Sequence, residues 1–465
     1  MVFSSFSFLL FFLPAVCLCY FAVPRRFRTA RNLILLLFSL FFYFWGEARG
    51  VLLMAAVILV SYFSAILIGK AKTKTARRLG LGLELLVCLG VLGYFKYAGW
   101  LLSMANSLLG LRLPAPELLM PIGISFFTFQ SMSYVFDVYQ GKVAPQRNLL
   151  CVSLYVSLFP QLVAGPIVRY GSVAKELVSR RESAEEIYEG LQRFLMGLGK
   201  KLLLANAFGR EAAAVFGMDP AVRSSPSAWL GAVCFTLQIY FDFSAYSDMA
   251  IGLGRVFGFH FPENFNYPYI SRSVTEFWRR WHISLSAWFR DYVYIPLGGS
   301  RRGLPRQILN LLAVWALTGL WHGASWNFVL WGLYYFVLLV LEKCFLGRLL
   351  ERLPRVLGHV YTLLAVTLGW VLFNCTEPGQ LGVYLRELFS FRGSFDHVLL
   401  ALRQNIPEFV FGLALCTPLP LKLFRLGQDK PWAEALRCLW LLAVLALSVL
   451  ALAGSSFNPF IYFRF

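Results

Sequence analysis

The stretch that decides the fold lies in the middle of the chain. Residues 273–303 read SVTEFWRRWHISLSAWFRDYVYIPLGGSRRG, and residues 308–331 read ILNLLAVWALTGLWHGASWNFVLW. The first part mixes aromatic and charged residues, whereas the second is apolar until a short run of small and polar residues. Two of the five histidines, His282 and His322, occur here, one in each part. Two titratable side chains therefore stand in very different surroundings.

A helical period runs through the first part. Aromatic and apolar residues recur at three- and four-residue steps, which gathers them on one helix face. These residues are Val274, Phe277, Trp278, Trp281, Leu285, Trp288, Phe289 and Tyr292. Glu276 precedes Arg280 by four residues, which is the favourable order for an ion pair within a helix. This pattern predicts one amphipathic helix in the plane of a membrane interface. His282 is then either a functional group or an ordinary interfacial histidine.

The second part is the most apolar region of the centre. Residues 308–341 are longer than one membrane crossing needs, because a helix rises about 1.5 Å per residue and the hydrocarbon core is about 30 Å thick. The run from His322 to Asn327 interrupts it. We therefore expect a strongly tilted or broken span with His322 near the interruption. A titratable group at that depth is costly unless it faces protein or a water-filled cavity. The alternative is a packed histidine that donates to a backbone carbonyl.

Composition sets the class of protein. Of the 465 residues, 58% are hydrophobic and 14% are charged, against about 25% charged in soluble proteins. The chain is therefore predicted to be an all-α, polytopic membrane protein with about ten or eleven crossings or partial crossings. We expect one membrane domain, divided into N-terminal spans (1–120), a central core (121–342) and C-terminal spans with an aromatic tail (343–465).

The net charge of +19 does not indicate nucleic-acid binding. The basic residues cluster in short loops beside apolar segments, as the positive-inside rule describes. Loops 25–31 and 70–78 are therefore predicted to be cytoplasmic, with the N-terminus outside and residues 103–117 as an external loop. The nine cysteines show no CxxC and no metal-site spacing, so neither a metal nor a disulfide framework is expected.

Several further segments carry polar residues among apolar ones. Residues 121–139 hold such groups at a density that predicts a helix lining an interior. Residues 159–170 contain two prolines and a glycine, which favours a broken or re-entrant segment. Residues 191–208, with Lys200 and Lys201, are expected at the interface. Within 230–259, Asp242 and Asp248 form a proton relay, an ion site, or a cavity-lining pair satisfied by hydroxyls and backbone.

Six stretches together resemble the membrane-bound O-acyltransferase family, in the bacterial branch typified by the membrane subunit that O-acetylates alginate. They read PIGISFFTFQSMSYVFDVY, FPQLVAGPIVRY, QIYFDFSAYSDMAIG, NFNYPYISRSVTEFWRRWHISLSAWFRDYVYIPLGG, LTGLWHGASWNFVLWG and NPFIYFRF, in this order from residue 121 to the C-terminus. The resemblance implies a ring of tilted helices around a thin wall pierced by a tunnel. It also implies that His322 is the intramembrane catalytic histidine and that His282 is the second, cytoplasm-side histidine.

The resemblance further implies the reaction. Such proteins take an acyl group from a cytoplasmic thioester, here acetyl-coenzyme A, and pass it to an acceptor outside the cell membrane with the help of an SGNH-hydrolase-like partner. A sister branch delivers D-alanine to teichoic acid. The chemistry of the residues agrees, since a neutral imidazole can take the proton of a hydroxyl that attacks a thioester. The remaining candidates for the tunnel or donor site are Arg279, Arg280, Arg290, Trp281, Trp321, Ser325, Asn327, Gln238, Asp242 and Asp248.

Two other classes of function compete with acyl transfer. A proton-coupled transporter or flippase would use His322, Asp242 and Asp248, but the inverted repeats typical of transporters are not visible in the sequence. A non-catalytic scaffold would leave the polar interruption unexplained. The aromatic tail, residues 455–465, is expected at the interface, where it either anchors the chain or holds an extracytoplasmic partner.

Overall fold

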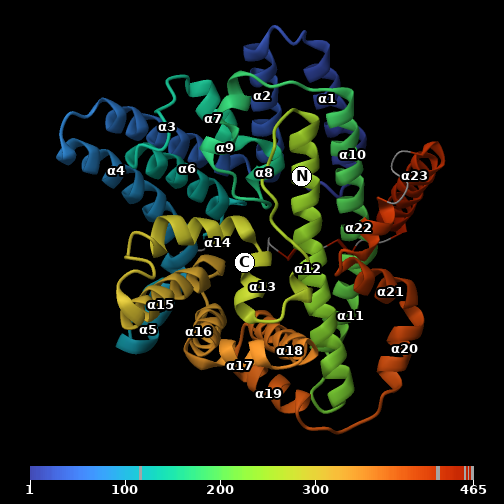
Figure 1. Cartoon of the computed structure of the whole chain (residues 1–465). Helices are drawn as coiled ribbons and strands as arrows, with labels where there is room; N and C mark the ends of the chain where they lie inside the picture. The colour runs from blue at the N-terminus through green and yellow to red at the C-terminus, as the bar shows by residue number, and fades with distance from the viewer. Residues whose placement is uncertain (115–117, 426–429, 455–456, 459, 462–465) are drawn as a thin grey trace. The chain divides into compact units, whose positions relative to one another are not determined.

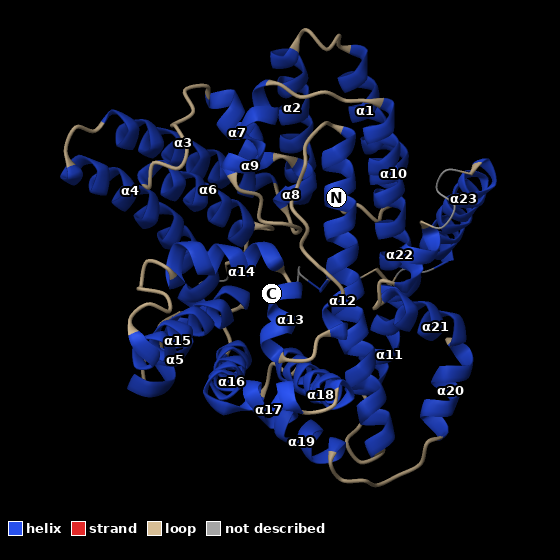
Figure 2. Ribbon diagram, in the orientation of Figure 1, coloured by secondary structure: helices blue, strands red, loops and turns tan. Residues whose placement is uncertain are grey.

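A computed structural model describes residues 1–114, 118–425, 430–454, 457–458 and 460–461. Every regular element in these residues is a helix (Figures 1 and 2). The chain separates into two compact units, residues 1–194 with 249–262, and residues 195–248 with 263–465. The all-α prediction is confirmed. The expected division at residues 120 and 342 stays a prediction.

The first unit contains the N-terminal helices. They are η1 (Ser7–Phe12), α1 (Leu13–Ala22), α2 (Arg28–Gly46), α3 (Ala48–Lys70), α4 (Lys74–Leu92), η2 (Gly93–Tyr97), α5 (Ala98–Leu109), α6 (Ile124–Tyr139), α7 (Leu149–Ser157), α8 (Phe159–Leu162) and α9 (Tyr170–Val178). Two long helices, α10 (Ala184–Gly199) and α12 (Ser225–Val256), contribute residues to both units.

The second unit contains the central and C-terminal helices. They are η3 (Lys200–Ala205), α11 (Asn206–Phe216), η4 (Pro268–Ile270), α13 (Val274–Arg280), α14 (Ile283–Phe289), η5 (Arg290–Tyr294), α15 (Gly303–His322), α16 (Trp326–Leu341), η6 (Glu342–Leu346), α17 (Gly347–Arg352), α18 (Arg355–Asn374), α19 (Pro378–Leu388), α20 (Asp396–Gln404), α21 (Ile406–Leu415), α22 (Leu419–Phe424) and α23 (Pro431–Gly454).

Helix α6 forms the interior of the first unit, as its polar residues predict. Nearly all of its residues are buried, and α3, α4 and α9 pack against it. Two of its hydroxyl groups donate to backbone carbonyl oxygens within the helix. The Thr128 hydroxyl donates to the Ile124 carbonyl oxygen at 2.6 Å, one turn earlier. Residues 159–170 are also broken as expected, since α8 has a single turn before an extended run to Tyr170.

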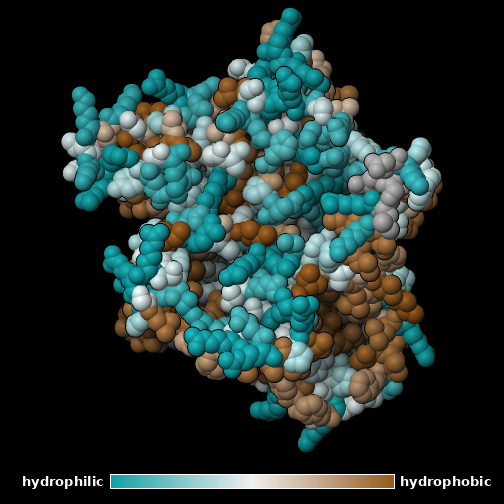
Figure 3. Space-filling view, viewed as in Figure 1, coloured by the Kyte–Doolittle hydropathy of each residue, from teal (hydrophilic) through white to brown (hydrophobic). Residues whose placement is uncertain are grey.

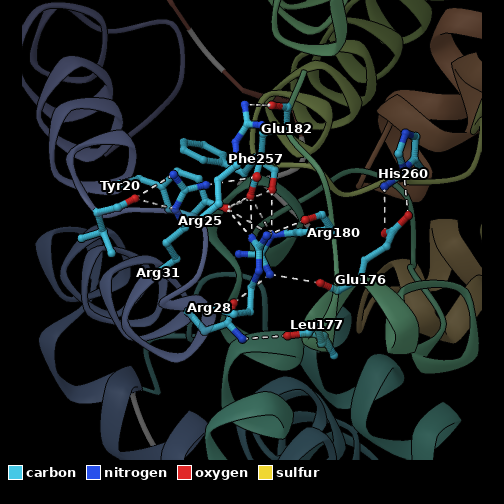
Figure 4. Close-up of polar contacts among 12 residues, drawn as sticks. Tyr20, Arg25, Arg28, Arg31, Glu176, Leu177, Arg180, Glu182, Phe257 and His260 are labelled. Carbon is cyan, nitrogen blue, oxygen red and sulfur yellow. Dashed lines mark hydrogen bonds and ion pairs between the residues drawn. The ribbon is translucent and has the colours of Figure 1, made fainter. Parts of the chain in front are cut away.

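A buried carboxylate ties the α1–α2 connection to the segment before α10 (Figure 4). Glu182 accepts hydrogen bonds from the Tyr20 hydroxyl and from Arg28 Nη1, the latter at 2.6 Å, and lies 3.0 Å from Arg31 Nη1. Arg25 donates to the Glu182 carbonyl oxygen at 2.7 Å. Burial opposes ionisation of Glu182, but the hydrogen bonds from Arg28 and Tyr20 outweigh it and lower the pKa. Residues 25–31, predicted as a loop, include the first turn of α2, and these basic residues lie on the same side of this unit as residue 182.

The same knot extends to the end of α12. Arg180 donates from Nε to the Phe257 carbonyl oxygen at 2.9 Å and from Nη1 to Asn32 Oδ1 at 2.7 Å. His260, just beyond, places its two ring nitrogens 2.7 Å from Glu176 and 3.2 Å from Glu186 (Figure 4 shows the first contact). Arginine side chains thus donate hydrogen bonds to carbonyl oxygens in the loops, which are not bonded within a helix.

In the described ranges, six helical segments are long and apolar enough to cross a membrane, or seven if the pair α20 and α21, bent by 79°, counts as one span. This is fewer than ten or eleven, and the largely buried helices α6 and α12 are not among the six. The six are Arg28–Gly46, Ala48–Lys70, Lys74–Leu109, Trp326–Arg352, Arg355–Asn374 and Pro431–Gly454. Hydrophobic side chains gather on the surface of α20 and α21 (Figure 3).

The third of these spans corrects one boundary. The helix predicted to end at residue 102 continues through η2 and α5 to Leu109, so the loop that we expect outside the membrane begins seven residues later than predicted. Apolar residues such as Leu108 continue beyond the predicted end and stay exposed on the helix. Residues 115–117 of that loop lie outside the described part.

Helices α15 and α16 form a hairpin in the second unit. Trp315 of α15 lies 5.5 Å, ring to ring, from Tyr335 of α16, and Gly319 lies against the backbone of Phe328 and Gly332. Contacts at these positions require the helices to run antiparallel. The expectation of one tilted or broken span is therefore wrong in form, although helix α15 ends at His322 as predicted. The glycines allow the two backbones to approach closely.

Lys201, within residues 191–208, is buried in the protein, and the expected interfacial position of this segment stays a prediction. Its ammonium is 1% exposed and lies 2.6 Å from Asp242 Oδ1 on α12. The other oxygen of Asp242 accepts the backbone N–H of Ile461 at 2.8 Å. Phe460 and Ile461 are buried, and Phe460 contacts the Tyr246 ring at 5.0 Å. Phe460 and Ile461 are thus packed inside the second unit, whereas the interfacial position predicted for the tail stays a prediction.

Candidate functional site

His282 lies at a break between two short helices. The predicted single helix over 274–292 ends at Arg280, and α14 starts at Ile283. His282 between them adopts left-handed backbone angles, φ 43° and ψ 56°, which non-glycine residues rarely adopt. Its side chain is 1% exposed, so the imidazole faces protein, and its depth relative to a membrane interface stays a prediction. The predicted ion pair is confirmed, since Arg280 Nη2 lies 2.9 Å from Glu276.

The break exists because the connection after α12 binds it. The Asn264 carbonyl oxygen accepts the backbone N–H of Ile283 at 3.0 Å. The Asn264 side-chain oxygen accepts the backbone N–H and the hydroxyl of Ser284, at 3.2 and 2.8 Å. His282 Nδ1 lies 3.1 Å from the same oxygen. These bonds replace the helical bonds that α13 and α14 would share in one continuous helix.

The other edge of the His282 ring faces aromatic side chains. Phe243 of α12 meets the imidazole edge-on at a centroid distance of 4.6 Å, and Trp321 lies 5.9 Å away. Nε2 is buried, and none of the residues that the structure describes forms a hydrogen bond with it. Burial lowers the pKa of His282 to about 3, because a charged imidazolium would be poorly solvated there. The ring is therefore a neutral imidazole at physiological pH.

His322 occupies the tip of the α15–α16 hairpin. It is the last residue of α15 and is half-buried. Aromatic rings surround it, with Trp321 and Trp331 each at 4.9 Å and Phe373 of α18 at 5.2 Å between centroids. Trp321 contacts the rings of both His282 and His322. The structure thus brings the two predicted histidines together around one indole.

The connector of the hairpin holds two further candidates. Ser325 stands at the N-cap of α16 in an extended conformation and makes no side-chain hydrogen bond to the helix. Asn327 is buried and donates from Nδ2 to the Phe373 carbonyl oxygen at 2.8 Å. Asn327 therefore fixes the hairpin tip to the end of α18, beside His322.

The basic candidates lie apart from the His282 ring. Arg279 is exposed, Arg280 is paired with Glu276, and Arg290 is exposed and lies 2.7 Å from Asp291. The sequence placed them beside His282 on one helix, but the break at that residue turns the imidazole into the core. Trp281 also points inward, with its ring 4.8 Å from that of Trp370.

The two acidic candidates of α12 form ion pairs with lysines. None of the hypotheses drawn from the sequence included these pairs. Asp242 pairs with Lys201, and Asp248 lies 2.7 Å from Lys200 in a half-buried pair. Gln238 is buried beside Gly209 of α11. Among the described residues, no group of three or more His, Cys, Asp or Glu side chains could hold a metal ion.

Sequence reasoning missed Asn264, Ser247, Ser284 and Phe373. Asn264 and Ser247 are buried, and Asn264 Nδ2 donates to the Ser247 hydroxyl at 3.1 Å. Asn264 stands 18 residues before His282 in a segment without helical period, so no spacing rule connects the two. A polar residue in the aromatic run NFNYPY was the available signal.

Comparison with known proteins gives consistent matches. The model of the MBOAT, membrane-bound O-acyltransferase, family matches residues 125–376. A probable alginate O-acetylase of Azotobacter vinelandii is 37% identical over 506 residues, which covers 100% of both chains. A peptidoglycan O-acetyltransferase of Helicobacter pylori is 30% identical over 100% of this chain and 98% of its own. A teichoic acid D-alanyltransferase of Bacillus subtilis is 28% identical over 56% of this chain and 70% of its own.

Proposed function

Because the chain belongs to the membrane-bound O-acyltransferase family and is an O-acyltransferase, we propose that it passes an acetyl group from a cytoplasmic thioester toward hydroxyls of a polysaccharide outside the membrane. The observation that carries the proposal is the placement of His322. It is a half-buried histidine at the tip of a hairpin, enclosed by aromatic rings, and it shares Trp321 with a second, neutral histidine.

His322 is the general base of this proposal. Its imidazole accepts the proton of the attacking hydroxyl as the oxygen bonds to the thioester carbonyl carbon. The carbon–sulfur bond then breaks, and the proton passes to the leaving thiolate. A positioned base of this kind contributes roughly 10²- to 10⁴-fold to the rate. The surrounding indole and phenyl rings exclude water, which protects the thioester from hydrolysis.

Acetyl is favoured over D-alanyl by the extent of the similarity. The alginate and peptidoglycan enzymes are O-acetylating proteins by name and align with this chain over its whole length. The D-alanyltransferase aligns with little more than half. We therefore assign acetyl-coenzyme A as the donor and a polysaccharide as the acceptor. An extracytoplasmic partner of the SGNH-hydrolase type completes the transfer, and the protein resides in the inner membrane with its N-terminus outside.

The test uses the purified full-length chain in lipid nanodiscs. Radiolabelled acetyl-coenzyme A and a D-alanyl carrier-protein thioester are supplied separately, and release of free thiol is followed with and without alginate oligosaccharides. We expect His322-dependent turnover of the acetyl donor. Turnover of the D-alanyl donor alone would overturn the acetyl assignment. Turnover of neither donor, with proton-coupled flux in vesicles, would replace the enzyme by a transporter.

A further inference from the structure

The orientation of the Asn264 amide is fixed by its neighbours. The atom that faces Ser284 receives a backbone N–H, which can only donate, so this atom is the carbonyl oxygen. The nitrogen on the other side then donates to the hydroxyl of Ser247. Asn264 is completely buried, so no water competes for these positions. The amide therefore has one arrangement that satisfies both neighbours.

The amide orientation determines the tautomer of His282. The Asn264 oxygen is an acceptor, so Nδ1 of His282, 3.1 Å away, must be the donor. A neutral imidazole has only one N–H. The lone pair therefore lies on Nε2, the buried nitrogen that has no hydrogen-bond partner among the described residues. Burial keeps the ring neutral, and the side chains recorded in contact with it, Asn264, Ser284, Phe243 and Trp321, carry no charge.

We propose that Asn264 is a positioning residue that holds His282 as a hydrogen-bond acceptor, with its Nε2 lone pair reserved for a hydroxyl or thiol of the bound substrates. A buried acceptor without a partner costs free energy, and a hydrogen-bond donor of a bound substrate would recover that cost. The left-handed backbone at His282 adds to that cost, and Asn264 maintains it by binding Ile283 and Ser284. The tautomer follows from the structure alone, whereas the use of the lone pair rests on the proposed acyl transfer.

The first experiment measures the tautomer without any assay of activity. Full-length protein with 15N-labelled histidine is studied in lipid by solid-state NMR near neutral pH. His282 is identified among the five histidines by the signals missing from His282→Gln. We expect a protonated, pyrrole-type Nδ1 and an unprotonated, pyridine-type Nε2. An Nε2–H tautomer or an imidazolium would overturn the inference and leave the proposed function intact.

The second experiment changes Asn264. In Asn264→Asp the carboxylate keeps the acceptor but adds a negative charge beside Nδ1, which favours the imidazolium. Protonation of Nε2, which removes the lone pair, then occurs at a higher pH than in the natural protein. The acid limb of kcat should therefore move to higher pH, and kcat below neutrality should fall by about 10²-fold. The pyridine-type signal of His282 should disappear under the same conditions. Asn266→Asp is the matched control, because Asn266 lies in the same connection with an exposed side chain.

A third variant separates positioning from folding. Ser247→Ala removes the partner of the Asn264 nitrogen and leaves the Asn264 oxygen and its three contacts in place. We expect a lower thermal midpoint, an unchanged tautomer and a pH profile close to that of the natural protein. If Asn264→Asp lowers the thermal midpoint but leaves the tautomer and the pH profile unchanged, Asn264 is only structural and the positioning role is wrong.

Discussion

His322 and His282 contact the same indole ring but are held in different ways. His322 ends a helix and is half-buried among aromatic rings. His282 is enclosed, and Asn264 fixes its tautomer. This difference suits a division of labour between a base that exchanges its proton and an acceptor that orients a substrate hydrogen.

The first prediction concerns the proton chemistry of His322. His322→Gln preserves much of the side-chain size but replaces the imidazole by an amide that cannot take a proton. We expect acyl transfer to fall by about 10² to 10⁴ while donor binding is retained. Steady-state transfer and equilibrium binding of acetyl-coenzyme A by the purified variant measure the two effects. His397→Gln, a histidine of α20, is the control. Turnover within a few fold of the natural protein would remove the general-base assignment.

The second prediction concerns Glu182 and pH. Its pKa is lowered from a usual value near 4.5, so the folded state favours the ionised form. That stabilisation is present above the unfolded pKa and is lost as pH falls through the folded pKa. Glu182→Gln should therefore lower the thermal midpoint clearly at neutral pH and less at acid pH. Thermal unfolding in detergent over this range tests it, with exposed Glu185→Gln as control. A difference independent of pH would contradict the ionic origin.

At the scale of elements, hydrophobic period predicted which segments are helical but not where they turn. The repeat over residues 274–292 continues across His282, because the apolar residues of α13 and α14 both face the core. Only the bonds from Asn264, distant in sequence, reveal the break. Likewise, the polar run after His322 located an interruption, but hydropathy alone does not distinguish a bent span from a hairpin.

The third prediction tests the close contact of α15 and α16. A methyl group at Gly319 would overlap the carbonyl oxygen of Phe328, so Gly319→Ala must push the helices apart and disturb the position of His322. We expect a lower thermal midpoint and reduced transfer. Gly82→Ala in α4 is the matched control, because its added methyl meets open space and alanine is the better helix former. Equal behaviour of the two variants would contradict the packing role of Gly319.

The fourth prediction assigns the aromatic tail to folding. Asp242 bridges Lys201 and the backbone of Ile461 in the core, so a chain truncated before Phe457 should lose stability and lose donor turnover together with glycan transfer. Asp242→Asn should destabilise by about 3–5 kcal/mol, because it leaves a buried ammonium without its carboxylate. Asp248→Asn, in the half-buried pair, should cost less. A truncated protein with normal donor turnover and a normal thermal midpoint would contradict the folding role and favour the alternative that the tail binds an extracytoplasmic partner.

At the scale of the whole molecule, composition predicted the class of protein but not how the helices and side chains are arranged. High hydrophobicity and short basic loops predicted a helical membrane protein, and the polar residues of α6 predicted its interior position. Hydropathy depends on which residues are present and not on where their side chains point. It therefore could not show that Lys201 is buried or that α12 contributes to two units. The histidines were predictable because motif resemblance names them, whereas Asn264 required the fold.

The last prediction is the topology of the first unit. Loops 25–31 and 70–78 are basic and are expected in the cytoplasm, and Arg25 binds the carbonyl oxygen of Glu182. Residue 181 must therefore lie on the same side as the first loop. Cysteines introduced at Arg26, Lys72 and Arg181, which are all exposed, should resist a membrane-impermeant maleimide in intact cells and react after permeabilisation. A cysteine at Arg112, in the predicted external loop, should react in both cases.

The background for this test lacks the three exposed native cysteines, Cys19, Cys344 and Cys438, which are replaced by serine. Labelling of residues 26 and 181 from outside, with residue 112 protected, would show that the whole unit has the opposite orientation in the membrane. Residues 26 and 181 must give the same result, because the contact between Arg25 and Glu182 keeps them on one side. Opposite behaviour of residues 26 and 181 would contradict that contact itself. The labelling pattern thus tests the orientation in the membrane and the buried ion cluster separately.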